Sequence, residues 1–230
     1  MAQEYLAVGV ADALGSRIVN GEVGPGRALR LEDVELEFGV SRSVAREAAK
    51  ILESFNLVRA RRRVGLLVQA PDQWDVMAPR VIGWHLDGPH RMAEMAWISE
   101  LRSAVEPLAA RLAAERATVE QCHVLGAAVT GMVVSAGAHE MEDYLRHDVV
   151  FHTTLLAAAR NPLVAAQGKV VTAVLEGRTA LMPFDPNPQA VALHRRVADA
   201  VSAHDGAAAE QAMRAIVAEA LDAMEHSAQG

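Results

Sequence analysis

Three residues in the second half of the sequence have side chains that can bind a metal ion. Asp148 and His152 lie four positions apart, so on a helix they project from one face and can grip the same ion. His194 can complete the set from a later helix. One carboxylate and two imidazoles suit a first-row divalent ion, with positions left open for water or a small anion. The alternative is chance, because the chain has nine histidines.

Basic residues near the start of the chain indicate a different chemistry. Arg42, Arg46 and Lys50 recur every fourth residue, which on a helix makes one cationic stripe, while Ala45 and Leu52 belong to an apolar stripe. Such a helix can lie against the phosphate backbone of a nucleic acid. An ordinary solvated helix carries the same residue types, so the stripe alone leaves both interpretations open.

The elements around this stripe predict a helix-turn-helix. Ser41 is a good N-cap for a helix that runs to about Ser54. An upstream helix, with apolar residues from Leu31 to Phe38, ends at Gly39, which suits a helix C-terminus. In this motif the second helix enters the major groove of DNA by its N-terminal end.

A basic β-hairpin is predicted directly after this helix. Its strands cover residues 57–61 and 66–68, and its turn covers residues 62–65. Four arginines lie within residues 59–63, where the wing of a winged helix contacts neighbouring phosphates or the minor groove. The sequence therefore predicts a winged helix-turn-helix with a small hairpin wing in residues 1–70.

Two flanking segments complete this domain. A first helix, at about residues 3–20, has an apolar stripe that can close the core. The stripe consists of Leu6, Val10, Leu14 and Ile18. Residues 71–90 contain proline and glycine breaks and are predicted to be a linker, but Trp74 and Trp84 make them too apolar to remain in water. We expect this linker to dock one domain against the other.

Only helical periodicity follows, in residues 91–230. Six helices in this length form a mainly α, six-helix bundle whose interior can hold a ligand between facing helices. The predicted helices cover residues 91–116, 118–136, 138–159, 162–182, 188–203 and 206–227. This domain is expected to bind an effector and to dimerise.

The composition indicates a soluble cytoplasmic protein. No apolar run reaches the ~18 residues that cross a bilayer, so no membrane partner is expected. The net charge is −7, but residues 1–70 have ten basic against nine acidic residues, and the acid is concentrated in the rest. DNA affinity must therefore come from charge arranged on one surface, and it should fall steeply with salt.

Three separated motifs resemble the GntR family of bacterial transcriptional regulators. They are the glycine-rich residues 21–26, residues 38–48 and Gly65 in the wing. The resemblance covers roughly residues 8–69 and implies binding to double-stranded operator DNA. It makes Arg42 and Arg46 the expected DNA contacts. The full predicted set of DNA-binding residues is Arg30, Ser41, Arg42, Ser43, Arg46, Lys50, Arg61, Arg62, Arg63 and Gly65.

The second domain resembles the FCD effector domain of the FadR-type branch of this family. The similar segments are residues 100–107, 148–152 and 157–163. Metal-binding members use an Asp, a His one turn on and two further His, and the resemblance assigns Asp148, His152 and His194 to three of these positions. The fourth falls at Ile216, which cannot be a ligand. Either three protein ligands hold Zn, Ni or Mn, or the site is degenerate and an effector binds without metal.

Arg102 is the best candidate for binding an effector carboxylate, since its guanidinium pairs bidentately with one. Its alternative role is an ion pair with Glu106, one turn away. Asp148, His152 and His194 complete the predicted effector site.

The resemblance implies a homodimeric regulator rather than an enzyme. We expect a repressor of a carbohydrate-acid or hydroxy-acid catabolic operon, released by a small carboxylate bound at the metal site. One alternative is a metal-dependent enzyme that uses Asp148, His152 and His194, against which stands the lack of a nucleophile or general-base motif. The other is a regulator whose helical domain only dimerises.

Overall fold

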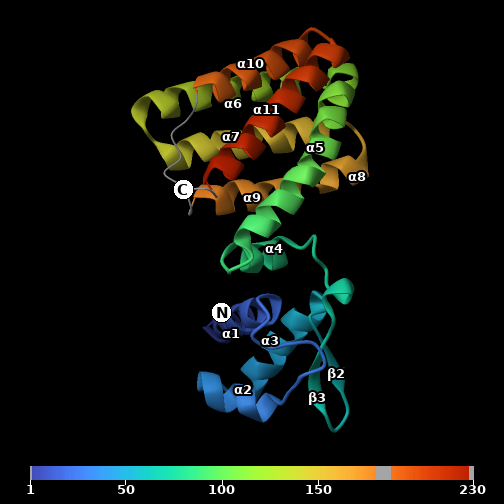
Figure 1. Cartoon of the computed structure of the whole chain (residues 1–230), viewed down its shortest axis with the longest axis vertical. Helices are drawn as coiled ribbons and strands as arrows, with labels where there is room; N and C mark the ends of the chain where they lie inside the picture. Colours follow the sequence, from blue (N-terminus) through green and yellow to red (C-terminus); the bar gives the residue numbers. More distant parts are fainter. Residues whose placement is uncertain (1, 180–187, 228–230) are drawn as a thin grey trace. The chain divides into compact units, whose positions relative to one another are not determined.

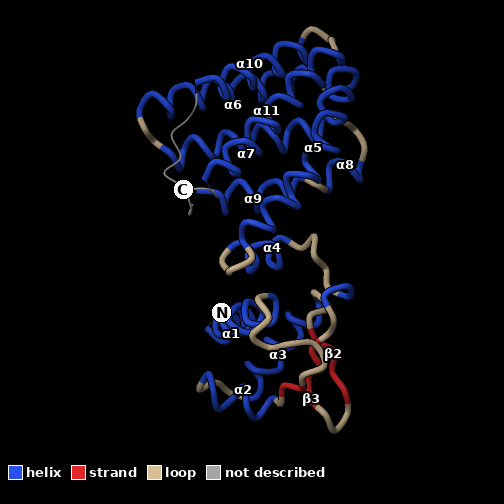
Figure 2. Tube along the Cα trace, viewed as in Figure 1, coloured by secondary structure: helices blue, strands red, loops and turns tan. Residues whose placement is uncertain are grey.

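The computed structural model describes residues 2–179 and 188–227 and divides the chain into two compact units. The first is Met1–Arg91 and the second is Met92–Gly230. The described residues are mainly helical, with one small sheet in the first unit, which confirms the predicted fold class (Figure 2). The segment 71–90, predicted as a linker, falls within the first unit.

The described part of the first unit combines helices with a three-stranded sheet (Figure 1). Its elements are α1 (Ala2–Val19), β1 (Ala28–Leu29), α2 (Leu31–Phe38), α3 (Arg42–Ser54), β2 (Val58–Arg61), β3 (Gly65–Val68), the 3-10 turn η1 (Pro71–Gln73) and α4 (Pro79–Leu86).

The helix-turn-helix forms as predicted from α2 and α3. Gly39 ends α2 in the left-handed region, at φ 61°, where glycine has no steric penalty. Oγ of Ser41 accepts a hydrogen bond from the backbone N–H of Val44, which confirms the predicted N-cap of α3. Ala45 and Leu52 are at most 1% exposed, so the apolar stripe of α3 packs in the core of this unit.

The apolar stripe of α1 is shifted from the predicted one. Leu14 and Ile18 are buried as expected, but Leu6 is 54% exposed. Ala7 and Ala11 face the core instead, because small side chains let α1 approach α3 closely. The prediction favoured the largest apolar residues and missed these alanines.

The wing is an antiparallel sheet with strand order β1-β3-β2. β2 and β3 confirm the predicted hairpin, in which Arg61 pairs with Gly65. β1 was not predicted, because its two residues are too few to produce a periodic signal. Gly65 has φ 111°, and a Cβ there would lie 2.5 Å from the carbonyl oxygen of Leu29, so only glycine fits between the hairpin and β1.

Helix α4 packs on α1 within the first unit. Nε1 of Trp84 donates to Oδ1 of Asp12 at 3.2 Å, and the Trp84 ring lies 2.4 Å from where a Cβ on Gly15 would be. Nδ2 of Asn20 donates to the carbonyl of Trp84 at 3.1 Å. These contacts bury Val81 as well, and they explain why apolar residues occur in a segment that the sequence marks as broken.

The described part of the second unit is an all-α bundle. Its helices are α5 (Arg91–Arg116), α6 (Val119–Ala138), α7 (Met141–Ala158), α8 (Pro162–Ala166), α9 (Gly168–Thr179), α10 (Pro188–Ser202) and α11 (Gly206–Ser227). The core is formed chiefly by leucine, valine and alanine side chains around Phe151 and Met132.

One helix that was predicted for this unit consists of two helices in the structure. The segment predicted as a single helix from residue 162 to 182 breaks at Gln167 into α8 and α9. Asn161 caps α8 and Pro162 is in its first turn, as predicted. Gly168 follows the break, and glycine disfavours helix continuation. Residues 180–182 of the prediction lie outside the described part of the chain.

Among the described helices, α6 is long and apolar enough to cross a membrane by length and composition, with a mean hydropathy of 1.3. It packs against α7 and α10 in the bundle. An apolar helix of a soluble bundle passes the same test, so α6 is weak evidence for membrane insertion.

Candidate metal centre and nucleic-acid surface

The structure brings the three predicted metal ligands together inside the second unit. α7 positions Asp148 and His152, α10 positions His194, and all three are buried. Oδ1 of Asp148 lies 3.1 Å from Nε2 of His194 and 3.4 Å from Nε2 of His152, and the two Nε2 atoms are 3.3 Å apart. Ligand atoms of one tetrahedral zinc ion are about 3.3 Å apart, so these three could hold one ion without rearrangement.

Hydrogen-bond partners on the far side of each ring support this assignment. Nδ1 of His194 lies 2.7 Å from the carbonyl oxygen of Ala190, which can only accept, so Nδ1 carries a proton. Nδ1 of His152 lies 2.8 Å from Oε2 of Glu106. In neutral rings both Nε2 atoms then offer lone pairs, and they face Oδ1 of Asp148. The donor set therefore fits a divalent metal.

The charges of Glu106, Asp148 and His152 are strongly coupled. Burial alone would raise the pKa of Glu106, but Arg102 and His152 outweigh it and lower the value to about 2. Burial would lower the pKa of His152, yet Glu106 and Asp148 raise it to about 9. Burial also opposes ionisation of Asp148, but hydrogen bonds and charge from His152 and His194 hold its pKa well below the usual range. The carboxylates of Glu106 and Asp148 thus favour positive charge at His152, whether a proton or a metal ion supplies it.

Arg102 makes the ion pair that was its alternative predicted role. Its Nε lies 2.6 Å from Oε1 of Glu106, and both side chains are buried rather than at the surface. A cavity of about 10 Å³ adjoins the pair, which is room for a single water. Gln167, at the break between α8 and α9, lines the same cavity, and its buried Oε1 has no hydrogen-bond partner among the described residues. The effector-binding role of Arg102 stays a prediction.

Ile216, the position of the missing fourth ligand, is 4% exposed and belongs to the hydrophobic core of this unit. It offers no ligand atom. Protein ligands in the described cluster are therefore limited to Asp148, His152 and His194.

Half of the predicted DNA-binding residues gather at one cleft near the N-terminal end of α3. A cleft of about 580 Å³ opens between the start of α2, the start of α3 and the wing. Four of the predicted arginines line it, and all four are exposed: Arg30, Arg42, Arg61 and Arg63. Gly65, also predicted, is in the wall of this cleft. The structure thus gathers positive charge from three elements on one surface.

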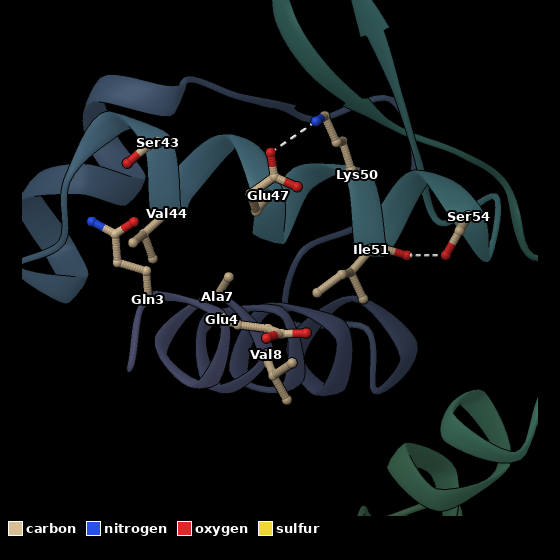
Figure 3. Close-up of a pocket in the computed structure, with 10 residues that line it drawn as sticks. All are labelled: Gln3, Glu4, Ala7, Val8, Ser43, Val44, Glu47, Lys50, Ile51 and Ser54. Atoms are coloured by element: carbon tan, nitrogen blue, oxygen red, sulfur yellow. Dashed lines mark hydrogen bonds and ion pairs between the residues drawn. The ribbon is translucent and has the colours of Figure 1, made fainter. Parts of the chain in front are cut away.

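The remaining predicted residues lie outside this cleft. Lys50 lines a separate groove of about 630 Å³ between α1 and α3, where its Nζ lies 2.8 Å from Oε1 of Glu47 (Figure 3). Ser43 lines that groove too, while Arg46 and Arg62 are exposed. Arg42 and Lys50 therefore line two different hollows, whereas the predicted cationic stripe placed them on one common surface.

Two acidic contacts were not predicted from the sequence. Glu106 of α5 reaches His152 of α7 through the packing of the bundle, and no local spacing reveals this. Oε1 of Glu32 lies 3.2 Å from a terminal nitrogen of Arg42, which connects the first turn of α2 to the start of α3. The regular spacing of the arginines was visible in the sequence, but their acidic partners were not.

Comparisons with known proteins agree with both regions. The profile of bacterial regulatory proteins of the gntR family matches residues 6–68, and that of the FCD domain matches residues 98–219. The galactonate operon transcriptional repressor of Escherichia coli K12 is 33% identical over 89% of this chain and 90% of its own. The repressor NanR of Escherichia coli K12 is 27% identical over 93% and 82%. A Streptococcus agalactiae GntR structure, 22% identical, superposes with a TM-score of 0.51 over 93% of this chain and 98% of its own.

Proposed function

The chain belongs to the GntR family of bacterial regulatory proteins and carries an FCD domain, and we propose that it is a repressor released from its operator by a small carboxylate. As a transcriptional regulator of this type, it is not an enzyme. The observation that carries the ligand-controlled part of the proposal is the buried triangle of Asp148, His152 and His194. Three titratable groups gathered in a protein core are costly unless each is paired, and one divalent ion would pair with all three.

The first unit supplies the DNA-binding part of the proposal. Arg42 and Arg46, at the N-terminal end of α3, are proposed to reach base edges in the major groove. Arg61, Arg62 and Arg63 of the wing are proposed to contact phosphates or the minor groove. Arg30, Ser41, Ser43, Lys50 and Gly65 complete the proposed surface, on which Ser41 and Gly65 also have the structural tasks described above.

In the second unit, Asp148, His152 and His194 would hold a divalent ion, with Zn, Ni or Mn as candidates. A bound ion would supply positive charge and open coordination positions for the oxygens of an anionic effector. Glu106 holds the His152 ring with Nε2 turned to the site, and Ala190 does the same for His194. With isoleucine at position 216, one more position is open to solvent or effector than in a four-ligand site.

The proposed effector is a sugar acid or a similar hydroxy acid. One relative is named as the repressor of a galactonate operon, and galactonate is a carboxylate with several hydroxyls. Arg102 and Gln167 border a small cavity with Glu106, which contacts His152, and we propose that they bind a carboxylate and a hydroxyl of the effector. The cavity is too small for such a molecule, and effector binding therefore requires the bundle to open.

We further propose a homodimer that acts on a palindromic operator in the cytoplasm. The outer face of α6 supports dimerisation, because residues 125–138 contain no charged residue while Val133 is 44% and Val134 63% exposed. A second copy covering this face would remove that apolar surface from water. A native mass equal to one chain, measured by light scattering, would contradict the dimer.

Thermal unfolding with added ligands tests the proposal. Chelator-treated protein should melt at a higher temperature after Zn, Ni or Mn is added, and higher again with one sugar acid. An ion at 100 times its dissociation constant stabilises the native state by about 2.7 kcal/mol. The His152→Ala variant should lose both shifts. Stabilisation by a carboxylate without metal would indicate a degenerate metal site, and no shift with any ligand would leave a bundle that only dimerises.

A further inference from the structure

One acidic residue lies among the arginines of the cleft in the first unit. Glu32, in the first turn of α2, lines the cleft together with the four exposed arginines named above. Its Oε1 lies 3.2 Å from a terminal nitrogen of Arg42, the first residue of α3. A carboxylate on a surface that attracts phosphates weakens that attraction, so its position needs a function other than affinity.

Stability does not account for the contact. The side chains of Glu32 and Arg42 are 63% and 64% exposed, and ion pairs at such exposure contribute little to folding. Glu32 also lies near the positive end of the α2 dipole, which favours an acidic residue. Asp33, the next residue, already supplies that charge from an exposed position in the same turn.

We propose that Glu32 is a specificity-determining residue of the operator contact, because its carboxylate holds the Arg42 guanidinium for reading one base pair. This inference rests on the DNA-binding role proposed for the first unit. Arginine identifies guanine by two parallel hydrogen bonds to O6 and N7, which require a fixed plane of the guanidinium. A contact to one terminal nitrogen restricts the flexible side chain and leaves its other N–H groups free for a base.

The Glu32 carboxylate also gives the arginines of the cleft different roles in DNA binding. Arg30, Arg61 and Arg63 have no acidic partner in the described part of the chain, so their charge is available for phosphates. Near Arg42 the negative charge of Glu32 repels a phosphate and leaves a base edge as the favoured contact. Three arginines of the cleft are therefore assigned to position the DNA, and Arg42 is assigned to read it.

The test uses full-length protein and a pool of random 30-base-pair duplexes, from which bound DNA is selected and sequenced. Glu32→Gln removes the charge, and Glu32→Asp keeps the charge but shortens its reach to Arg42. Glu37→Gln is the matched control, since Glu37 is an exposed carboxylate on the same helix that pairs with Arg17 outside the cleft. Melting temperatures of all four proteins verify that each is folded.

We expect wild type and Glu37→Gln to select the same motif. Both Glu32 variants should lose discrimination by about tenfold at one base pair in each half-site, while the other positions persist. Glu32→Gln should also bind unrelated DNA more tightly than wild type, because a repulsive charge is gone. Glu32→Asp should not.

An unchanged motif in both Glu32 variants overturns the inference and leaves DNA binding intact. Equal relaxation of the motif in Glu37→Gln also overturns it, since general charge would then be the cause. A wild-type protein that selects no sequence refutes the DNA-binding proposal and this inference with it.

Discussion

The two candidate functional regions each contain an arginine paired with a glutamate, and the two pairs differ in their surroundings. Arg42 and Glu32 are more than half exposed and lie 3.2 Å apart, whereas Arg102 and Glu106 are at most 6% exposed and lie 2.6 Å apart. Water screens the first pair, so it adds little to stability, and Arg42 stays accessible to DNA while Glu32 contacts it. The second pair is desolvated, and neither charge can lose its partner without a large penalty. An exposed pair can therefore orient a side chain for a further partner, whereas a buried pair holds its own site together.

The largest effect should follow from breaking the buried pair. Glu106→Ala leaves the Arg102 charge buried without its partner and removes the contact of His152, so it should lower the free energy of unfolding by about 3–5 kcal/mol. Urea unfolding at neutral pH measures this change.

Asp143→Ala is the matched control, since Asp143 and Arg146 also lie 2.6 Å apart but are 41% and 61% exposed. It should cost at most about 1 kcal/mol. Equal losses in the two variants would contradict the role of burial in this comparison.

On the exposed surface, loss of an arginine should affect DNA binding and spare the fold. Arg46→Ala removes a proposed base or phosphate contact, so operator affinity should fall at least tenfold and the slope of log affinity against log salt should decrease by about 1 if a phosphate contact is lost. Its free energy of unfolding should change by less than about 0.5 kcal/mol.

Fluorescence anisotropy over a range of salt concentrations measures affinity and slope together. Arg146→Ala, an exposed arginine of α7, should change neither. An unaltered operator affinity in Arg46→Ala would refute the assignment of α3 as the recognition helix.

The last prediction concerns Glu94, a carboxylate of α5 that is 6% exposed. Burial raises its pKa from 4.5 to about 7, so between these values the unfolded chain binds fewer protons than the folded one. Stability should therefore fall as the pH rises through this window. Glu94→Gln should melt higher than wild type at pH 8 and lose this advantage at pH 4, as followed by circular dichroism. An advantage that does not change with pH would contradict the raised pKa.

Local patterns in the sequence predicted most of the helices and the hairpin. Ser41, Gly39 and Asn161 act through contacts within a few residues of themselves, so their residue types alone indicate a cap or a helix end. The proximity of Asp148 and His152 was also predictable, since they are one helical turn apart, and their use as metal ligands stays a prediction.

Contacts between elements account for what the sequence did not predict. β1 is recognisable only beside β3, and the contact of Glu106 with His152 depends on the packing of α5 and α7. Leu6 was assigned to the core because it is large, although close helix packing selects Ala7. The break at Gln167 has only the weak local signal of the glycine that follows it.

Helix α4 sets the point at which the first unit can be exchanged as a module. Trp84 and Val81 pack on α1, although they lie beyond the residues that match the gntR profile and before those that match the FCD domain. A chimera that joins this unit to a foreign effector domain at residue 70 would leave the α4-binding surface of α1 bare. A junction after Arg91 would keep α4 with the unit on which it packs, and recombination between regulators should favour that boundary.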